Sequence, residues 1–425
     1  MNVICLVVDR LHVGYLGCYG NTGVITPELN RLAAESFLFD QATIDSPELA
    51  SLYRSWGRGW HALQPDIPTD DWSLPTALAA AGMRTTLVTD DLRVVDDLPE
   101  GESFERIVVE APLPKRAADE AKSAHMHAFF DRTLDWLDTA SEPFMLWMHT
   151  ATLGVVWDAP TELRQQYVAE EDAVPSEDVA VPHLELPEGY DPDELLAIAQ
   201  AYSAQVTLLD EHIGHFLECL RGSALAKDTL FILVGARGLS MGEHRLVGAW
   251  DNVLHGELVH VPWLMRFPDG LGMLARSQAL IQPADLPLTI AEWCKVTLPQ
   301  RDPAVAQSLL PIICGESTVA RERACVTSAA GERGIRTPRW YLRQLAERAE
   351  IEPAADNAGS GSNVRQPCLL YSKPDDLHEV NEVFDLCTDI GELLADAYRA
   401  FAVGCQQQTL SDLPPLDVRL KTSHA

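Results

Sequence analysis

A carboxylate and two arginines follow apolar runs of the sequence, and their positions point to the chemistry of a binding site. Asp9 and Arg10 come directly after residues 3–8, and Arg237 lies shortly after the run at 229–234. Both runs are typical of buried parallel strands, because both of their faces are apolar. Ligands of open α/β sheets bind beyond the carboxyl ends of such strands. A carboxylate there can hold a metal ion, whereas a guanidinium group can neutralise that carboxylate or bind an anion.

The charges of Asp9, Arg10 and Arg237 allow two roles for the arginines. A buried carboxylate without a partner is costly, and a fixed guanidinium offsets that cost as a metal would. We therefore expect the arginines to neutralise Asp9. The alternative is that their excess positive charge binds a ligand that carries sulfate or phosphate, because the planar guanidinium fits such groups.

Strands and helices alternate through most of the chain, as they do in proteins built around a parallel sheet. Capping residues and glycines mark several helix ends. The predicted helices cover residues 26–36, 73–81, 124–137 and 195–221, and the predicted strands cover residues 3–8, 84–89, 144–149 and 229–234. This alternation predicts an α/β fold with a large, mostly parallel sheet flanked by helices.

The pattern changes after residue 304, where short strands are predicted at 324–327, 334–335 and 340–342. Residues 379–402 could form a closing helix. We therefore predict a large α/β domain at residues 1–305 and a small subdomain at residues 306–425. Two segments carry few signals of regular structure: the acidic segment at 170–194 predicts a long loop, and residues 353–363 predict a flexible linker or loop tip.

Composition limits the partners and the compartment. The net charge is −31, which argues against nucleic acid and anionic membranes, because both require a basic surface. The nine cysteines have no CxxC spacing, which favours free thiols in a reducing compartment. No signal-peptide pattern precedes the first strand, and no apolar run approaches the ~18 residues that span a bilayer. The chain as given is therefore predicted to be cytoplasmic, and its oligomeric state stays open.

An ordered series of short motifs extends along nearly the whole chain. The series includes LGCYG at residues 16–20, AGMRT at 81–85, GEH at 242–244 and RTPRW at 336–340. Together these motifs resemble those of the sulfatase family, within the alkaline-phosphatase-like superfamily. The resemblance implies a large parallel sheet and a small C-terminal antiparallel sheet packed by a helix. It also implies hydrolysis of sulfuric esters with a metal ion, usually calcium.

The metal positions depart from the pattern of the family that the chain resembles. Where the family has a first pair of Asp-Asp or Asp-Ser, this chain has Asp9 and Arg10. Where it has a second pair of Asp-His or Asp-Asn, this chain has Ala236 and Arg237. Only Asp9 is left as a metal ligand, and one carboxylate does not make a calcium site.

The nucleophile and proton-transfer positions depart as well. The best register with the family's nucleophile motif places Leu49 at the nucleophile and Tyr53 at its arginine. Gly154 stands where the family has a second histidine after the strand that ends at His149, and Ala249 stands near the expected lysine. Ser51 is a possible alternative nucleophile, but no base or metal is apparent to activate it.

These observations predict a sulfatase-like protein that is catalytically inactive and binds an anionic small molecule or a sulfated glycan. The candidates for anion binding are Arg10, Arg54, Arg237, His244 and His255. No cofactor is expected on this hypothesis. Two alternatives stay open: an active sulfuric or phosphoric ester hydrolase with a rearranged site, which would use Ca²⁺ or Mg²⁺, and a structural partner of an active paralogue.

Overall fold

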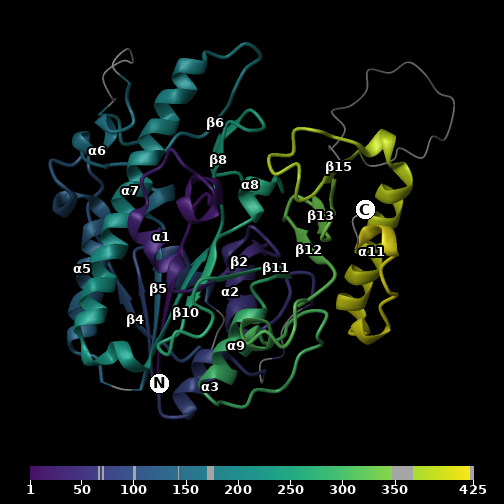
Figure 1. The fold of residues 1–425 in the computed structure, drawn as a ribbon, viewed down its shortest axis with the longest axis horizontal. Helices are drawn as coiled ribbons and strands as arrows, with labels where there is room; N and C mark the ends of the chain where they lie inside the picture. Colours follow the sequence, from purple (N-terminus) through teal and green to yellow (C-terminus); the bar gives the residue numbers. More distant parts are fainter. Residues whose placement is uncertain are drawn as a thin grey trace.

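A computed structural model describes residues 1–65, 68, 71–98, 102–141, 143–169, 177–346 and 367–421. An eight-stranded sheet lies at its centre, with the strand order β11-β2-β10-β7-β1-β5-β3-β4 (Figure 1). All of its strands run in the same direction except β10, which is antiparallel to both of its neighbours. The strands are β1 (Asn2–Val8), β2 (Phe37–Ala42), β3 (Arg84–Thr89), β4 (Glu105–Val108), β5 (Phe144–Thr150), β7 (Thr229–Gly235), β10 (Trp263–Arg266) and β11 (Ala275–Ile281).

The register of the three central strands brings their polar ends together. The last residue of β1, Val8, pairs with Thr150 of β5 on one side and with Gly235 of β7 on the other. All three strands are fully buried, which explains why apolar residues occupy both faces of each. Asp9 and Arg237 therefore leave the sheet at the same edge, as the sequence predicts.

Helices cover both faces of the central sheet (Figure 1). One face packs against α1 (Pro27–Ala34), α5 (His125–Asp138) and the long helix α7 (Pro192–Gly222). The other face packs against α2 (Leu49–Arg58), α3 (Leu74–Ala80) and α9 (Asp285–Trp293). Shorter helices are α4 (Leu92–Asp97), α6 (Thr161–Gln165), α8 (Gly256–Val259) and α10 (Leu310–Ile313). This arrangement confirms the predicted α/β fold with its mostly parallel sheet flanked by helices.

The C-terminal part forms a four-stranded antiparallel sheet covered by a helix. The strands are β12 (Ala324–Thr327), β13 (Arg333–Arg336), β14 (Trp340–Gln344) and β15 (Cys368–Ser372), and the helix is α11 (Thr388–Gln407). Val326, Tyr341 and Tyr371 of this sheet belong to the same apolar cluster as α2 and α9. The small sheet is therefore packed onto the large one, while the proposed boundary between residues 305 and 306 stays a prediction.

The closing helix begins later than the sequence pattern predicts. Residues 379–387 are not part of it, because the carboxylate of Asp376 accepts hydrogen bonds from the backbone N–H groups of Val380 and Asn381, 2.9 and 2.8 Å away. These bonds fold the segment into a turn, and Glu379 adopts a left-handed φ of 55°. The helix then begins at Thr388.

The predicted acidic loop contains one short strand. β6 (Leu184–Glu185) pairs with β9 (Leu246–Gly248), which pairs in turn with β8 (Ser240–Met241). Residues 170–176 of that loop, and the whole predicted linker at 353–363, lie outside the described residues. The described helices include none with the length and apolar character that a membrane crossing requires.

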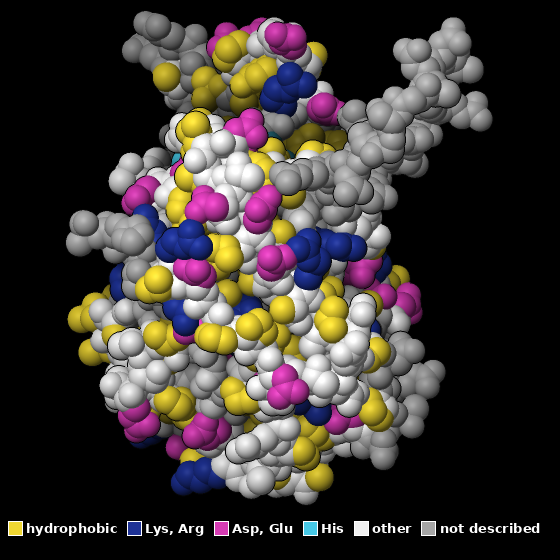
Figure 2. All heavy atoms as spheres, turned by 90° about the vertical axis from the view of Figure 1, so that its right-hand side faces the viewer, with side chains coloured by type: hydrophobic (Ala, Val, Ile, Leu, Met, Phe, Trp, Pro, Cys, Tyr) yellow, Lys and Arg dark blue, Asp and Glu magenta, His cyan; other side chains and the backbone are white. Residues whose placement is uncertain are grey.

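On the face toward which α11 lies, basic side chains are interspersed with acidic ones (Figure 2).

Candidate functional site

Asp9 and Arg237 form a buried, doubly hydrogen-bonded ion pair at the edge of the large sheet. Arg237 Nε donates to Asp9 Oδ1 at 2.9 Å, and Arg237 Nη2 donates to Asp9 Oδ2 at 2.6 Å. Both side chains are almost completely buried. Burial alone would raise the pKa of Asp9, but the charges of Arg237 and Arg10 outweigh it and hold the pKa below its usual value. Asp9 is therefore ionised at neutral pH.

A second carboxylate joins the pair and recruits Arg10. Arg10 Nη2 donates to both carboxylate oxygens of Asp251, at 2.7 and 3.0 Å, and Arg237 Nη1 donates to Asp251 Oδ2 at 3.1 Å. Arg10 Nε also lies 3.8 Å from Asp9 Oδ2. Two carboxylates and two guanidinium groups thus form one network with balanced charge. We call Asp9, Arg10, Arg237 and Asp251 the arginine–carboxylate network.

The residues of this network do not fit the divalent cation that the resemblance implies. Both oxygens of Asp9 already accept hydrogen bonds from Arg237. A hard cation needs six or more oxygen ligands and tolerates adjacent positive charge poorly. Here two guanidinium groups stand beside the only carboxylate at the predicted metal positions. The geometry supports the expected neutralising role of Arg10 and Arg237, whereas anion binding by these two residues stays a prediction.

The side chain of Arg10 occupies space that a glycine leaves open. A Cβ atom on Gly154 would lie 2.7 Å from Arg10 Cγ, closer than van der Waals contact allows. Arg10 itself has a left-handed φ of 63°, and Tyr202 Oη donates to its carbonyl oxygen at 2.7 Å. Gly154 is the position where the resemblance implies a histidine. The glycine at 154 and the arginine at 10 are therefore sterically coupled.

The start of α2 offers no nucleophilic atom at the predicted position. Leu49 is its first residue and is buried in the apolar core. Tyr53 Oη lies 2.9 Å from His149 Nδ1 and accepts a hydrogen bond from Trp147 Nε1 at 3.3 Å. Burial lowers the pKa of His149 to about 4. His149 is consequently neutral at physiological pH.

Two further candidates on α2 lie apart from the arginine–carboxylate network. Arg54 Nη2 donates to the carbonyl oxygen of Gln64 at 3.3 Å, and no described carboxylate pairs with it. Ser51 Oγ donates to Glu48 Oε2 at 3.4 Å, and no histidine of the described residues hydrogen-bonds to it. Ser51 therefore has no base in place to activate it as a nucleophile. Anion binding by Arg54 stays a prediction.

His244 and His255 lie against each other, and anion binding by either of them stays a prediction. Their rings stack with centroids 3.7 Å apart, and His244 Nδ1 lies 3.0 Å from Glu257 Oε1. His255 Nδ1 lies 2.5 Å from Arg343 Nη1 and 3.8 Å from Glu379 Oε2. Although burial lowers the pKa of His244, the bond to Glu257 outweighs it, so that the net shift is upward. Burial is the main cause that lowers the pKa of His255.

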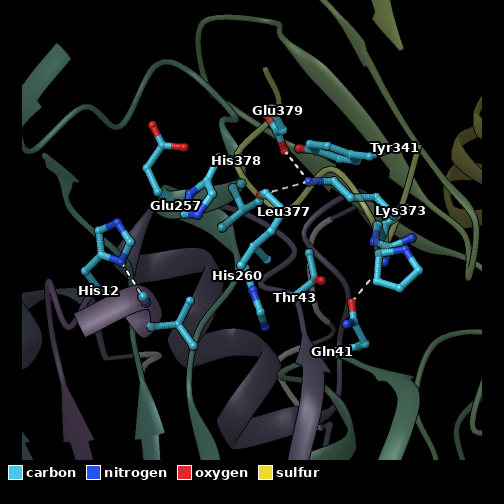
Figure 3. Close-up of a pocket in the computed structure, with 16 residues that line it drawn as sticks. His12, Gln41, Thr43, Glu257, His260, Tyr341, Lys373, Leu377, His378 and Glu379 are labelled. Atoms are coloured by element: carbon cyan, nitrogen blue, oxygen red, sulfur yellow. Dashed lines mark hydrogen bonds and ion pairs between the residues drawn. The ribbon is translucent and has the colours of Figure 1, made fainter. Parts of the chain in front are cut away.

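A cavity of about 70 Å³ opens between the edge of the large sheet and the C-terminal part that carries the antiparallel sheet (Figure 3). By volume it has room for about five water-sized groups. Its polar lining includes His12, Thr43, His260, Arg336, Lys373 and Glu379. Lys373 Nζ lies 3.3 Å from Glu379 Oε1 and donates to the carbonyl oxygen of Leu377 (Figure 3).

Arg336 is the cation of this cavity that lacks a carboxylate partner. Its Nη2 donates to Gln41 Oε1 at 3.0 Å, and Nη1 donates to the carbonyl oxygen of Thr337. Among the described residues no carboxylate forms an ion pair with it, although its exposed fraction is only 7%. Burial lowers the pKa of Arg336 to about 10, although the charge of Glu379 acts against this shift, so Arg336 still carries its charge at neutral pH.

Three residues of these sites were not predicted from the sequence. Asp251 lies in a loop 241 residues from Arg10, and no motif marks it. Glu379 was assigned to a helix. Arg336 begins the RTPRW motif, and that motif was the one available signal. Arginines are rarely buried without a partner, so an arginine at the end of a short buried strand points to a polar role.

Comparison with known proteins assigns the family. The sulfatase family model matches residues 1–296. The chain belongs to the sulfatase family, which confirms the resemblance. It is 24% identical to mouse iduronate 2-sulfatase over 399 residues, covering 74% of this chain and 68% of that protein. The human iduronate 2-sulfatase is also 24% identical, with 63% of this chain and 60% of that protein covered.

Solved structures share the whole fold. A phosphonate monoester hydrolase of Agrobacterium radiobacter superposes with a TM-score of 0.75 and 15% identity, over 100% of this chain and 99% of that one. A 2-O GAG sulfatase superposes with a TM-score of 0.69 and 15% identity, over 99% of this chain and 95% of that one. At such low identity the likeness establishes the fold, and the chemistry has to be argued from the site itself.

Proposed function

We propose that this sulfatase-family protein binds a sulfated or phosphorylated ligand without hydrolysing it. The observation that carries the proposal is the arginine–carboxylate network, because it places two fixed cations where the family's metal would act. Hydrolysis of a sulfate ester needs an activated nucleophile and an electrophile that stabilises the developing charge. Leu49 supplies no nucleophilic atom, and the guanidinium groups of Arg10 and Arg237 are already bonded to carboxylates.

We place the anion in the cavity lined by Arg336. A buried guanidinium without a carboxylate partner pays a desolvation cost that a bound anion would offset. Its planar donor groups suit the oxygens of sulfate and phosphate. Lys373 and His260 line the same cavity and offer polar contacts to the rest of a ligand.

The relatives favour a sulfated saccharide as the ligand class. One solved structure of similar fold contains D-glucosamine-2-N,6-O-disulfate as its substrate, and another is a 2-O GAG sulfatase. A family member that keeps the fold but lacks the metal chemistry can retain recognition of such groups. A sulfated glycan fragment is therefore the expected ligand, and a phosphorylated small molecule is the second candidate.

Two measurements on the full-length protein test this proposal together. Calorimetry with inorganic sulfate and with a sulfated glucosamine measures binding, and ion chromatography of the same mixtures measures released sulfate. We expect saturable binding and no released sulfate, with or without added Ca²⁺ or Mg²⁺. Catalytic release of sulfate would contradict the proposal and favour a rearranged hydrolase.

Substitution of Arg336 locates the ligand. Arg336→Ala removes a charged hydrogen-bond donor, which is worth about 1.5–3 kcal/mol, so binding should weaken roughly tenfold to a hundredfold. Arg333→Ala is the matched control, because Arg333 is an exposed residue of the same strand. Equal affinity in the wild type and in Arg336→Ala would exclude this cavity as the anion site.

A further inference from the structure

A second cluster of side chains has the composition of a transition-metal site. His244, His255 and Glu379 each offer one ligand atom, and these atoms lie within 4.8 Å of one another. They come from three separate segments: the loop between β8 and β9, the residue before α8, and the turn before α11. Two imidazole nitrogens and one carboxylate oxygen form a ligand set that Zn²⁺ uses in open sites, whereas Ca²⁺ and Mg²⁺ prefer oxygen alone.

His244 is held in the manner of a metal-ligating histidine. Its Nδ1 lies 3.0 Å from Glu257 Oε1 and donates to it, so in the neutral imidazole the lone pair is on Nε2. Nε2 is buried and has no hydrogen-bond partner among the described residues. A carboxylate that orients an imidazole from behind is the usual outer support of a zinc-bound histidine. Glu257 therefore acts as the positioning residue for His244.

Glu379 carries unused ligand capacity. Its side chain is 1% exposed, and neither carboxylate oxygen has a hydrogen-bond partner in the described part of the chain. Both carboxylate oxygens are therefore without hydrogen bonds that a metal ion would have to compete with. Lys373 Nζ at 3.3 Å and Arg343 Nη1 at 3.9 Å face the carboxylate, so a bound ion has to displace these two charges.

The backbone directs the carboxylate toward the histidines. Glu379 adopts a left-handed φ of 55°, a conformation that is strained for a non-glycine residue. A Cβ atom on Gly256 would lie 2.6 Å from Glu379 Oε1, so the glycine next to His255 allows the carboxylate to approach. Strain of this kind persists where the surroundings hold a functional group in place.

Binding of an ion requires one rearrangement. The two imidazoles are stacked at an interplanar angle of 19°, so their lone pairs lie in two nearly parallel planes and do not converge on one point. His255 must turn about its side-chain torsions and release Arg343. Arg343 keeps Glu332 as its partner, because Nε donates to Glu332 Oε1 at 2.8 Å and Nη2 lies 2.7 Å from the same oxygen.

We propose that His244, His255 and Glu379 bind one divalent transition-metal ion of the zinc type. The site shares no side chain with the arginine–carboxylate network and does not depend on the anion-binding function proposed above. Glu257 orients His244, and the turn at Glu379 links the site to the C-terminal subdomain. Metal binding would therefore tie that turn to the large domain.

The test uses the full-length protein after dialysis against a chelator, without any sulfated ligand. Calorimetry with ZnCl₂ measures stoichiometry, and the visible absorption of bound Co²⁺ reports a nitrogen- and oxygen-liganded site. We expect one equivalent to bind. His244→Ala and His255→Ala should each weaken binding at least tenfold, and Glu257→Gln should weaken it about tenfold to a hundredfold through loss of orientation.

His378→Ala is the matched control, because His378 is exposed, lines the same cavity and neighbours Glu379. It should bind Zn²⁺ as the wild type does. Circular dichroism checks that each variant is folded. If His244→Ala is not folded, His244→Asn replaces it. No saturable binding to the wild type, or unchanged binding by folded variants of His244 and His255, would overturn the proposal.

Discussion

Asp9 and Arg237 depend on each other because each is buried where water cannot solvate its charge. Removing one of them leaves the other with only part of its compensation. Arg237→Ala should therefore lower the free energy of unfolding by about 3–5 kcal/mol, the usual cost of breaking a buried ion pair. Denaturant titration measures the change.

The double variant Asp9→Leu/Arg237→Met is the informative comparison for this pair. Because it removes both charges and keeps apolar volume, its cost should be far smaller than the sum of the two single losses. If the single and double variants showed additive losses, the two residues would not act as a pair, and the central element of the site would be wrong.

Gly154 and Arg10 allow a second residue-level prediction. Gly154→Ala places a methyl group where Arg10 Cγ lies 2.7 Å away, so we expect a loss of about 1–3 kcal/mol in unfolding free energy. The same substitution in an Arg10→Ala background should cost clearly less, because the clash is gone. Equal losses in both backgrounds would show that the two positions are not sterically coupled.

The N-terminus of helix α1 is capped by the carboxylate of a residue in helix α7. Asp210 accepts hydrogen bonds from the backbone N–H groups of Glu28 and Leu29, at 3.0 and 2.7 Å, so it caps α1 across 181 or more residues. Thr26, the first residue of the helix predicted at 26–36, does not cap it and instead accepts a hydrogen bond from Gly17 N at 3.0 Å. A sequence pattern identifies helix starts by neighbouring residues, and it cannot identify a cap from another helix.

Burial raises the pKa of Asp210 from 3.8 to about 6. The folded protein thus binds this proton more tightly than the unfolded chain does. The contribution of Asp210 to stability is fully present below about pH 4 and is lost as the pH rises through about 6. The wild type should therefore lose stability relative to Asp210→Asn between pH 4 and pH 7, as denaturant titrations at several pH values would measure. A difference that does not change with pH would contradict this account.

The early end of the predicted C-terminal helix also has a tertiary cause. Residues 379–387 have a helical pattern, but the Asp376 carboxylate and the buried ion pair of Glu379 with Lys373 hold them in a turn. Local propensity is a weak preference, and such contacts override it. The metal candidate Glu379 was missed for this reason.

At the scale of the whole molecule, the order of motifs was sufficient to predict the fold. Strands, helices and the two sheets follow from local patterns and from the family's motif series. The pairing within the site was only half predictable, since parallel strands put Asp9 near Arg237, whereas Asp251 and Arg336 reach their places through loops and through docking of the small sheet.

The two sheets should unfold together. Val326, Tyr341 and Tyr371 of the C-terminal part are buried in the core of the large domain, so separating the parts would expose that core. We expect one transition in scanning calorimetry, with calorimetric and van't Hoff enthalpies in agreement. Two well-separated transitions would show that the parts fold as independent units.

Calorimetric titration with Ca²⁺ and Mg²⁺ tests whether the arginines have replaced the metal beside Asp9. We expect no saturable heat at millimolar concentrations, because two guanidinium groups occupy the positions of the missing metal ligands. Stoichiometric binding of either ion, lost in a folded Asp9→Asn variant, would contradict this expectation: Asp9 would then be a metal ligand, and the protein a hydrolase candidate.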